Sequence, residues 1–142
     1  MEQRIAITVD CVIFKMAKEG SVVHILLVQR KKAPFKEDWA LPGGFLEEQE
    51  TMETGALREL REETGLRIKE IEQLKAFGAP GRDPRGRTIT IAFWGETDSE
   101  QELKAADDAS QASWFSEDRL PALGFDHSEI LKFALLQYRK KS

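Results

Sequence analysis

The sequence has little of several features that define whole classes of proteins. One cysteine, Cys11, among 142 residues excludes an intramolecular disulfide and any zinc site built from several cysteines. No apolar run approaches the roughly 20 residues that cross a bilayer, and no signal-peptide core follows the first residues. Basic residues number 21 against 25 acidic ones, which argues against a general nucleic-acid binder. We therefore expect a cytoplasmic protein that contacts neither membrane nor nucleic acid.

What the sequence does contain is enough apolar material for a packed core. Hydrophobic residues make up 41% of the chain and charged residues 32%, so wholesale disorder is not expected. We find no internal repeat, low-complexity tract or long linker. The sequence therefore predicts a single domain over residues 1–142.

Strands and helices are expected to interleave along the chain. Predicted strands cover Arg4–Met16, Val22–Gln29, Ile68–Phe77, Thr88–Trp94 and Ala112–Phe115. The first of these alternates, so we expect one buried side. Predicted helices cover Thr51–Thr64, ended by Gly65, and a segment from an N-cap at Ser128 to Lys140. We expect a turn at Lys18–Ser21 and a shaped loop at Trp39–Phe45. This order favours an α/β sandwich with helices on both faces of a sheet.

The most informative stretch is the segment from Gly44 to Leu66, which holds seven glutamates: Glu47, Glu48, Glu50, Glu53, Glu59, Glu62 and Glu63. On a helix of about 3.6 residues per turn, Glu62 and Glu63 lie about 60° and 40° to either side of Glu59. Three carboxylates therefore share one face. They form either a solvated acidic surface paired with Arg58 and Arg61, or a site for a hard divalent cation such as Mg²⁺ or Mn²⁺.

The spacing of these residues decides between the two interpretations. Gly44 is followed after five residues by Glu50, and after seven more by the run 58–66 with sequence RELREETGL. This resembles the Nudix box of the Nudix hydrolase superfamily at all seven fixed identities and both aliphatic positions. Chance agreement in one window is on the order of one in a billion at average residue frequencies. The preceding run 39–45, WALPGGF, is similar to the loop that usually precedes the box.

The resemblance implies a fold, a reaction and roles for individual residues. It implies an α/β/α sandwich with a mixed central sheet, and hydrolysis of a nucleoside diphosphate linked to another group. Glu59, Glu62 and Glu63 would be metal ligands, joined by the main-chain carbonyl of Gly43. Arg58 would orient the carboxylates. Glu50 would support the junction between loop and helix. A bound Mg²⁺ would neutralise the pyrophosphate and activate water.

An arginine-rich loop bears on the choice of substrate. Arg82, Arg85 and Arg87 are either solvated residues of a hairpin or groups that grip phosphate oxygens. The run 82–92, RDPRGRTITIA, resembles a sub-group of Nudix proteins associated with ADP-ribose, and so does the run 125–130, FDHSEI. These motifs also occur in Nudix domains that sense ligands inside transcriptional regulators. The resemblance favours ADP-ribose over a free nucleoside triphosphate.

Further candidates remain open between a functional and a structural role. His127 is either a packed or capping side chain or a substrate contact. Trp39 and Phe45 either stack on an adenine ring or pack in the interior. Asp107 and Asp108 precede the last strand, where the superfamily commonly places a further metal ligand or a general base, and Asp108 is our candidate base. Glu96 and Glu102 are alternatives for this role.

These observations lead to three hypotheses for the function. The first is an Mg²⁺-dependent ADP-ribose pyrophosphatase that releases AMP and ribose 5-phosphate. The second is a pyrophosphohydrolase for another nucleotide, such as a damaged nucleoside triphosphate. The third is a ligand-sensing domain without catalysis, which the complete set of box glutamates and the absence of a following DNA-binding segment disfavour. The expected partner is a small nucleotide, and a homodimer is possible.

Overall fold

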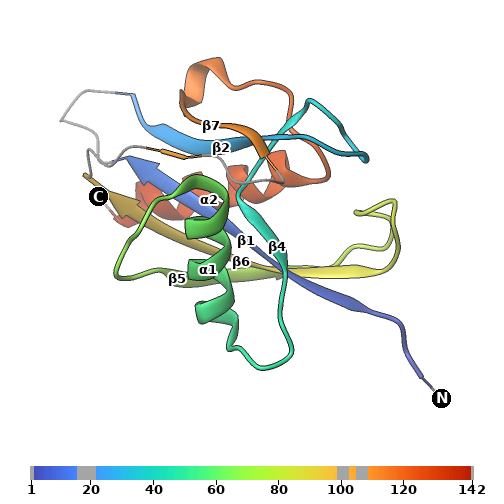
Figure 1. Ribbon diagram of the computed structural model, residues 1–142. Coiled ribbons are helices and arrows are strands. Elements are labelled where there is room, and N and C mark those ends of the chain that lie inside the picture. Colours follow the sequence, from blue (N-terminus) through green and yellow to red (C-terminus); the bar gives the residue numbers. More distant parts are fainter. Residues whose placement is uncertain (1, 16–21, 99–102, 105–108, 142) are drawn as a thin grey trace.

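The computed structural model describes residues 2–15, 22–98, 103–104 and 109–141. Seven strands form one mixed sheet, and two helices lie on its opposite faces (Figure 1). The elements in chain order are β1 (Ala6–Lys15), β2 (His24–Arg30), β3 (Trp39–Ala40), β4 (Gly43–Phe45), α1 (Met52–Thr64), β5 (Glu72–Phe77), β6 (Thr88–Thr97), β7 (Ala109–Ser116), a short 3₁₀ turn (Glu117–Arg119) and α2 (His127–Lys141). The predicted α/β sandwich with a mixed sheet is confirmed.

Strand β1 lies at the centre of the sheet and organises the rest. It pairs in parallel with β6 along its whole length, from Ala6 opposite Thr88 to Lys15 opposite Thr97. Strand β5 adds to the outer side of β6 in antiparallel orientation. On the other side of β1 come β2 and β3, with β7 also paired to β2. Because β1 is central, it is buried on both faces from Val9 to Phe14, and the expectation of one buried side is wrong.

Two apolar cores result, one on each face of the sheet. Val9, Cys11 and Ile13 of β1 pack with Leu60 of α1. The alternate residues Val12 and Phe14 pack on the other face with residues of α2. Each helix therefore fixes its position by burying one stripe of side chains, which leaves its remaining faces available for polar groups.

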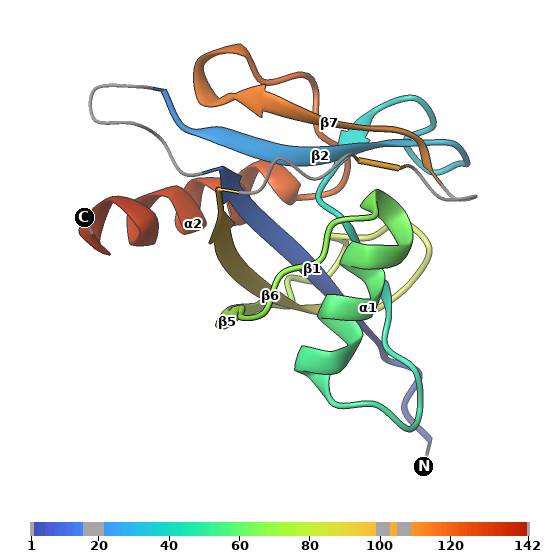
Figure 2. The same cartoon turned by 60° about the vertical axis from the view of Figure 1, so that its left-hand side comes forward.

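The sheet divides near one end of β1, and this division creates the space for a site. Strands β1 and β2 pair only at Phe14–Ile25 and Lys15–His24, and then diverge (Figure 2). The short strands β4 and β3 occupy the widening gap, β4 paired with β1 and β3 with β2. The segment Trp39–Phe45 is therefore largely strand rather than the loop expected from sequence. Its strands are too short, and too interrupted by proline and glycine, to show a period of two.

The ends of α1 were predicted more accurately from the sequence than the start of α2. Helix α1 matches the prediction: the Thr51 side chain accepts a hydrogen bond from the Thr54 amide, and Gly65 ends the helix with a φ of 78°. Helix α2 already begins at His127, so Ser128 lies inside its first turn and is not the N-cap. Instead, the carbonyl of Asp126 accepts hydrogen bonds from the amides of Glu129 and Ile130.

The remaining differences concern the ends of strands. Strand β5 begins only at Glu72, and β6 continues to Thr97 rather than Trp94 because β1 pairs with it that far. The predicted turn at Lys18–Ser21 lies outside the described residues. Neither helix in the part of the chain described is long and apolar enough to cross a bilayer.

Candidate active site

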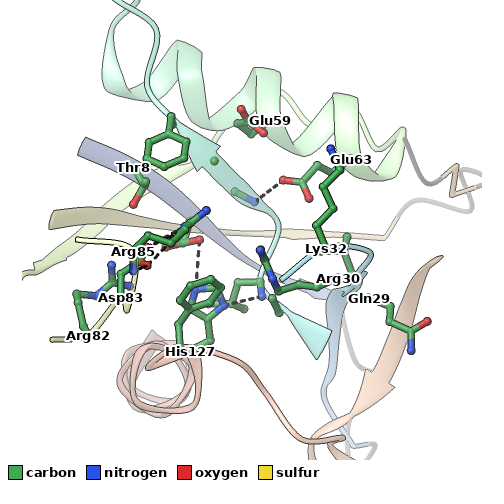
Figure 3. A pocket seen from close by; sticks show the side chains of 18 of the residues that line it. Thr8, Gln29, Arg30, Lys32, Glu59, Glu63, Arg82, Asp83, Arg85 and His127 are labelled. Carbon is green, nitrogen blue, oxygen red and sulfur yellow. Dashed lines mark hydrogen bonds and ion pairs between the residues drawn. The ribbon is translucent and has the colours of Figure 1, made fainter. Parts of the chain in front are cut away.

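A cavity of about 390 Å³ lies where the two halves of the sheet diverge. One wall comes from α1 and β4, and His127 of α2 lies across from it. The loop between β5 and β6 lines the cavity on one side, β2 and the segment after it line the other side, and β1 also contributes (Figure 3). Its lining residues are Thr8, Asp10, Val28, Gln29, Arg30, Lys32, Ala33, Ala40, Leu41, Gly43, Gly44, Phe45, Glu47, Arg58, Glu59, Glu63, Arg82, Asp83, Arg85, Phe125 and His127. Most of them are charged or polar, as expected of a site for a charged ligand.

The wall formed by α1 presents two carboxyl groups to the cavity, those of Glu59 and Glu63 (Figure 3). Burial raises the pKa of both, most strongly that of Glu63, and each is held close to a like-charged neighbour. The Glu63 carboxylate also accepts a hydrogen bond of 2.9 Å from the backbone N–H of Gly43. Helix and loop are thereby joined at the point where the acidic groups gather.

Arg58 forms ion pairs with the acidic side chains of this wall. Its guanidinium donates two hydrogen bonds to Glu50, at 2.6 and 2.9 Å, and one to Glu59 at 2.8 Å. A further contact of 3.2 Å reaches Glu62, whose side chain is half exposed and does not line the cavity. These bonds raise the pKa of Arg58 and lower that of Glu50 to about 2. Arg58 thus fixes the carboxylates in place while offsetting part of their repulsion.

The acidic wall fits a divalent cation. Within the described part of the chain, no three acidic, histidine or cysteine side chains already converge as a complete set of metal ligands. Glu59 and Glu63 nevertheless form a pair of hard oxygen donors whose like charges a cation would neutralise. Gly44 lies so close that an added Cβ would be 2.7 Å from the Glu59 carboxylate. The glycine therefore lets the backbone approach the place where an ion would sit.

Basic side chains line two other sides of the cavity. Arg85 lies on one side, Arg30 and Lys32 on the other, and Figure 3 shows Lys32 extending toward Glu63. Burial, and then the neighbouring Arg85, lower the pKa of Arg30, which is the response of a cation crowded by another cation. A bound anion would relieve this crowding. Arg30 and Lys32 were not predicted as site residues, because their segment was predicted to be only a surface loop.

The three arginines of the arginine-rich loop lie in three different environments. Arg82 is buried, with a side chain only 4% exposed, and it donates two hydrogen bonds to Asp126, at 2.7 and 2.9 Å. Arg85 forms a bidentate pair with Asp83 and lies over the rings of Phe45 and Phe125, 5.2 and 5.4 Å from their centroids. Arg87 donates to the carbonyl of Gly78 and does not line the cavity. Of the three, Arg85 is thus the one with its guanidinium half exposed at the cavity.

The floor of the cavity holds a buried polar cluster in which the sequence predicted His127 but not Asp10. Asp10 accepts a hydrogen bond of 2.6 Å from Thr90, and its other oxygen lies 3.5 Å from Nε2 of His127. Burial raises the pKa of Asp10 and lowers that of His127. The signal in the sequence was an acid inside an otherwise apolar strand, since such an acid needs a buried partner.

The remaining candidate residues lie in several places. Phe45 lies at the cavity, with 51% of its surface exposed. Trp39 does not line it, because its ring packs edge-on against Phe115 at 4.7 Å. Glu96 also lies elsewhere, where it accepts a hydrogen bond from Tyr138. Asp107, Asp108 and Glu102 fall outside the described residues.

The site and the fold agree with a family assignment. The NUDIX domain model matches residues 4–134, and the chain belongs to this family. The chain is 46% identical over 127 residues to the ADP-ribose pyrophosphatase of Methanocaldococcus jannaschii, covering 89% of this chain and 71% of the relative. It is 32% identical to the ADPR responsive transcriptional repressor NtrR of Acinetobacter baylyi, covering 95% of this chain and 55% of the repressor.

Solved structures show the same architecture. A MutT/nudix family protein from Enterococcus faecalis superposes with a TM-score of 0.90 at 36% identity, covering 99% of this chain and 64% of that one. The NUDIX domain of Shewanella oneidensis NrtR, complexed with ADP ribose, superposes with a TM-score of 0.87 at 32% identity, covering 96% and 90%. The chain thus spans only about half to two thirds of the A. baylyi repressor and the E. faecalis protein.

Proposed function

We propose that the protein is a pyrophosphohydrolase that uses a divalent metal ion to split ADP-ribose into AMP and ribose 5-phosphate. The observation that carries this proposal is the arrangement of charge across one cavity, with Glu59 and Glu63 on one wall and Arg30, Lys32 and Arg85 on two other sides. To bind here, a pyrophosphate needs a cation that separates it from the carboxylates. It also needs hydrogen-bond donors for its outer oxygens. The relative named as an ADP-ribose pyrophosphatase and the NUDIX domain complexed with ADP ribose support the choice of substrate.

In this proposal α1 provides the metal ligands. Glu59, Glu62 and Glu63 would hold the ion together with the main-chain carbonyl of Gly43. Oxygen ligands of this kind suit Mg²⁺, with Mn²⁺ as a substitute. Such an ion, when bound, neutralises the pyrophosphate and lowers the pKa of a coordinated water. Arg58 keeps the carboxylates oriented through the hydrogen bonds described above.

The basic sides of the cavity bind the substrate in the proposed complex. Arg30, Lys32 and Arg85 donate to phosphate oxygens, and Phe45 offers an exposed ring on which a base can stack. The sequence motif suggested that Arg82 and Arg87 also contact the substrate directly. Their role is less direct, because Arg82 is paired with Asp126 and Arg87 lies outside the cavity. Asp108, or its neighbour Asp107, takes the proton from the attacking water.

The proposal is tested by offering nucleotide sugars and nucleotides with Mg²⁺ and separating the products by chromatography. We expect ADP-ribose to be the preferred substrate, with AMP and ribose 5-phosphate as products. Glu63→Gln abolishes most of this turnover because it removes charge that the metal needs, whereas Glu53→Gln, an exposed glutamate in the first turn of the same helix, retains it. Equal turnover in the two variants would overturn the metal site.

The role of the general base needs a separate measurement. Asp108→Asn or Asp107→Asn should reduce kcat by about 10²- to 10⁴-fold at every Mg²⁺ concentration, the usual contribution of general-base catalysis. Partial rescue by added Mg²⁺ would instead identify a further metal ligand. Full activity of the double variant would exclude both residues.

Two other functions follow from specific relatives. A ligand sensor is favoured by the repressor NtrR and would bind ADP-ribose without turnover. Hydrolysis of a damaged nucleotide is favoured by the 8-oxo-dGTP diphosphatase of Proteus vulgaris, 38% identical over 81 residues, and would appear in the same substrate panel. A cytoplasmic location, a single domain, a homodimer and the absence of nucleic-acid binding remain predictions.

A further inference from the structure

A buried histidine connects α2 to the segment that precedes β4. His127 is the first residue of α2, and its side chain is only 6% exposed. Its Nδ1 accepts a hydrogen bond of 3.0 Å from the backbone N–H of Leu41. Because a backbone N–H can only donate, Nδ1 carries no proton, and the proton of the neutral ring is on Nε2, facing Asp10.

An acidic side chain faces the ring from the side of the sheet. Asp10 of β1 lies 3.5 Å from Nε2, and its second oxygen accepts a hydrogen bond of 2.6 Å from Thr90 of β6. All of these side chains are buried, and no buried side-chain polar atom in the described residues lacks a partner. The position of Nδ1 is therefore set by two central strands and the first turn of α2.

The segment that His127 holds leads directly to the acidic wall. Two residues after Leu41, the amide of Gly43 donates to the Glu63 carboxylate at 2.9 Å. Between them, the carbonyl of Pro42 accepts from the amide of Cys11 at 2.8 Å. Gly43 lies against β1 so closely that an added Cβ would be 2.2 Å from the Val9 carbonyl oxygen. Residues 41–43 are thus one short segment, held at Leu41 by His127 and at Pro42 and Gly43 by β1, and its last amide orients Glu63.

We propose that His127 is a positioning residue: its Nδ1 fixes the Leu41 amide, and the segment 41–43 transmits this position to the Glu63 carboxylate. The proposal rests on the proposed function only where it concerns catalysis by Glu63. It differs from the substrate contact considered from sequence, since both ring nitrogens are already engaged by protein atoms. It also differs from simple packing, because it depends on one acceptor atom at one position of the ring.

Two substitutions distinguish the role of Nδ1 from that of the rest of the His127 side chain. In His127→Asn the amide oxygen lies near the place of Nδ1, so it can accept from Leu41 but cannot reach Asp10. In His127→Gln the amide extends to the place of Nε2, so it can reach Asp10 but offers no acceptor to Leu41. Both variants remove the ring and leave a neutral amide, so each controls for the other.

The first measurement is amide hydrogen exchange of Leu41 and Gly43 by NMR, which requires neither metal nor substrate. We expect both amides to exchange faster in His127→Gln than in the wild type, and to stay protected in His127→Asn. Equal protection in the two variants overturns the proposal. If neither variant folds, the wild type decides: Leu41 and Gly43 must open together, and independent exchange of the two amides overturns the proposal.

The second measurement is steady-state kinetics with ADP-ribose and Mg²⁺. We expect kcat to fall by about 10- to 100-fold in His127→Gln, since a misplacement near 1 Å costs about that much, with KM nearly unchanged. His127→Asn should lose several-fold less. A rise in KM at constant kcat in both variants would instead make His127 a substrate contact. A wild type without ADP-ribose hydrolysis would overturn the proposed function, while the exchange experiment would still decide the role of His127.

Discussion

Arg58 is the single side chain on which the acidic wall depends. It contacts four carboxylates, those of Glu47, Glu50, Glu59 and Glu62, and also donates to the carbonyl of Phe45. A planar guanidinium offers five N–H donors in a fixed arrangement, whereas an ammonium is a compact point charge. The geometry of the wall therefore depends on the shape of this residue as well as on its charge.

For this reason Arg58→Lys should impair catalysis although it keeps the charge. Loss of one charge-assisted hydrogen bond costs about 1.5–3 kcal/mol, which corresponds to roughly 10- to 150-fold in kcat/KM. Arg61→Lys, at an exposed position of the same helix, is the matched control and should change kcat/KM little. Steady-state kinetics on the two variants make the comparison. Equal effects would show that charge alone suffices at position 58.

Glu50 gives a prediction about pH. The hydrogen bonds from Arg58 lower its pKa from 4.5 to about 2 in the folded protein. A carboxyl group with a depressed pKa contributes stability above its unfolded pKa and loses it as the pH falls toward the folded value. We therefore expect Glu50→Gln to be less stable than the wild type at pH 7, with the difference narrowing between about pH 4.5 and 2. Thermal unfolding of both proteins across this range measures it. A constant difference would contradict the assignment.

At the scale of elements, the loop between β5 and β6 is tied to the start of α2 by the buried pair of Arg82 and Asp126. Breaking a buried ion pair by removing one partner costs about 3–5 kcal/mol, because the remaining charge is left without compensation. Arg85 in the same loop has a half-exposed side chain that faces the cavity. Arg82 thus holds the loop in place, whereas Arg85 faces the cavity.

We expect this difference to appear when each arginine is replaced by alanine. Arg82→Ala should lower the free energy of unfolding by about 3–5 kcal/mol in urea denaturation. Arg85→Ala should cost less, because the buried Asp83 carboxylate keeps its hydrogen bond from the backbone N–H of residue 85. The same Arg85→Ala variant should raise KM for ADP-ribose, because a donor to the phosphates is lost. Stability effects of the opposite order would mean that Arg85, rather than Arg82, holds the loop.

The elements also show where sequence alone was sufficient. Helix α1 could be located to within one residue, because Thr51, Gly65 and the spacing of the glutamates are local signals. Strands β3 and β4 could not, because a strand of two or three residues is defined by its partner and not by its own pattern. Asp10 and Arg30 could not be predicted as site residues for a similar reason. They line the site only because β1 and β2 diverge around it, which is a property of the sheet and not of either strand alone.

At the scale of the whole molecule, the sheet separates two cores, and Cys11 lies within the one beneath α1. Its side chain is fully buried, its Sγ donates to the carbonyl of Ala56, and burial raises its pKa well above the ordinary value. The thiolate is the reactive form of cysteine, so both burial and pKa protect this thiol in the folded state.

Because the sequence contains one cysteine, thiol labelling should report the unfolding of the whole molecule. We expect a thiol reagent to label native protein slowly, and the labelling rate to follow the global unfolding equilibrium as urea is added. Leu60→Ala, which leaves a cavity in the same core, should speed labelling in proportion to its loss of stability. Rapid labelling that is insensitive to urea would reveal local opening beneath α1 instead.

The parallel pairing of β1 with β6 also has a consequence for how the chain folds. Ala6 meets Thr88 and Lys15 meets Thr97, so the central contact of the sheet joins segments about 80 residues apart. Contacts between such distant segments form slowly, because the entropy of closing the intervening chain must be lost before they stabilise anything. During synthesis, α1 and its glutamates leave the ribosome before β6 does. The acidic wall therefore acquires the arginines of the cavity and its buried floor only when folding is nearly complete, and a partly made chain has the helix of the site but no site.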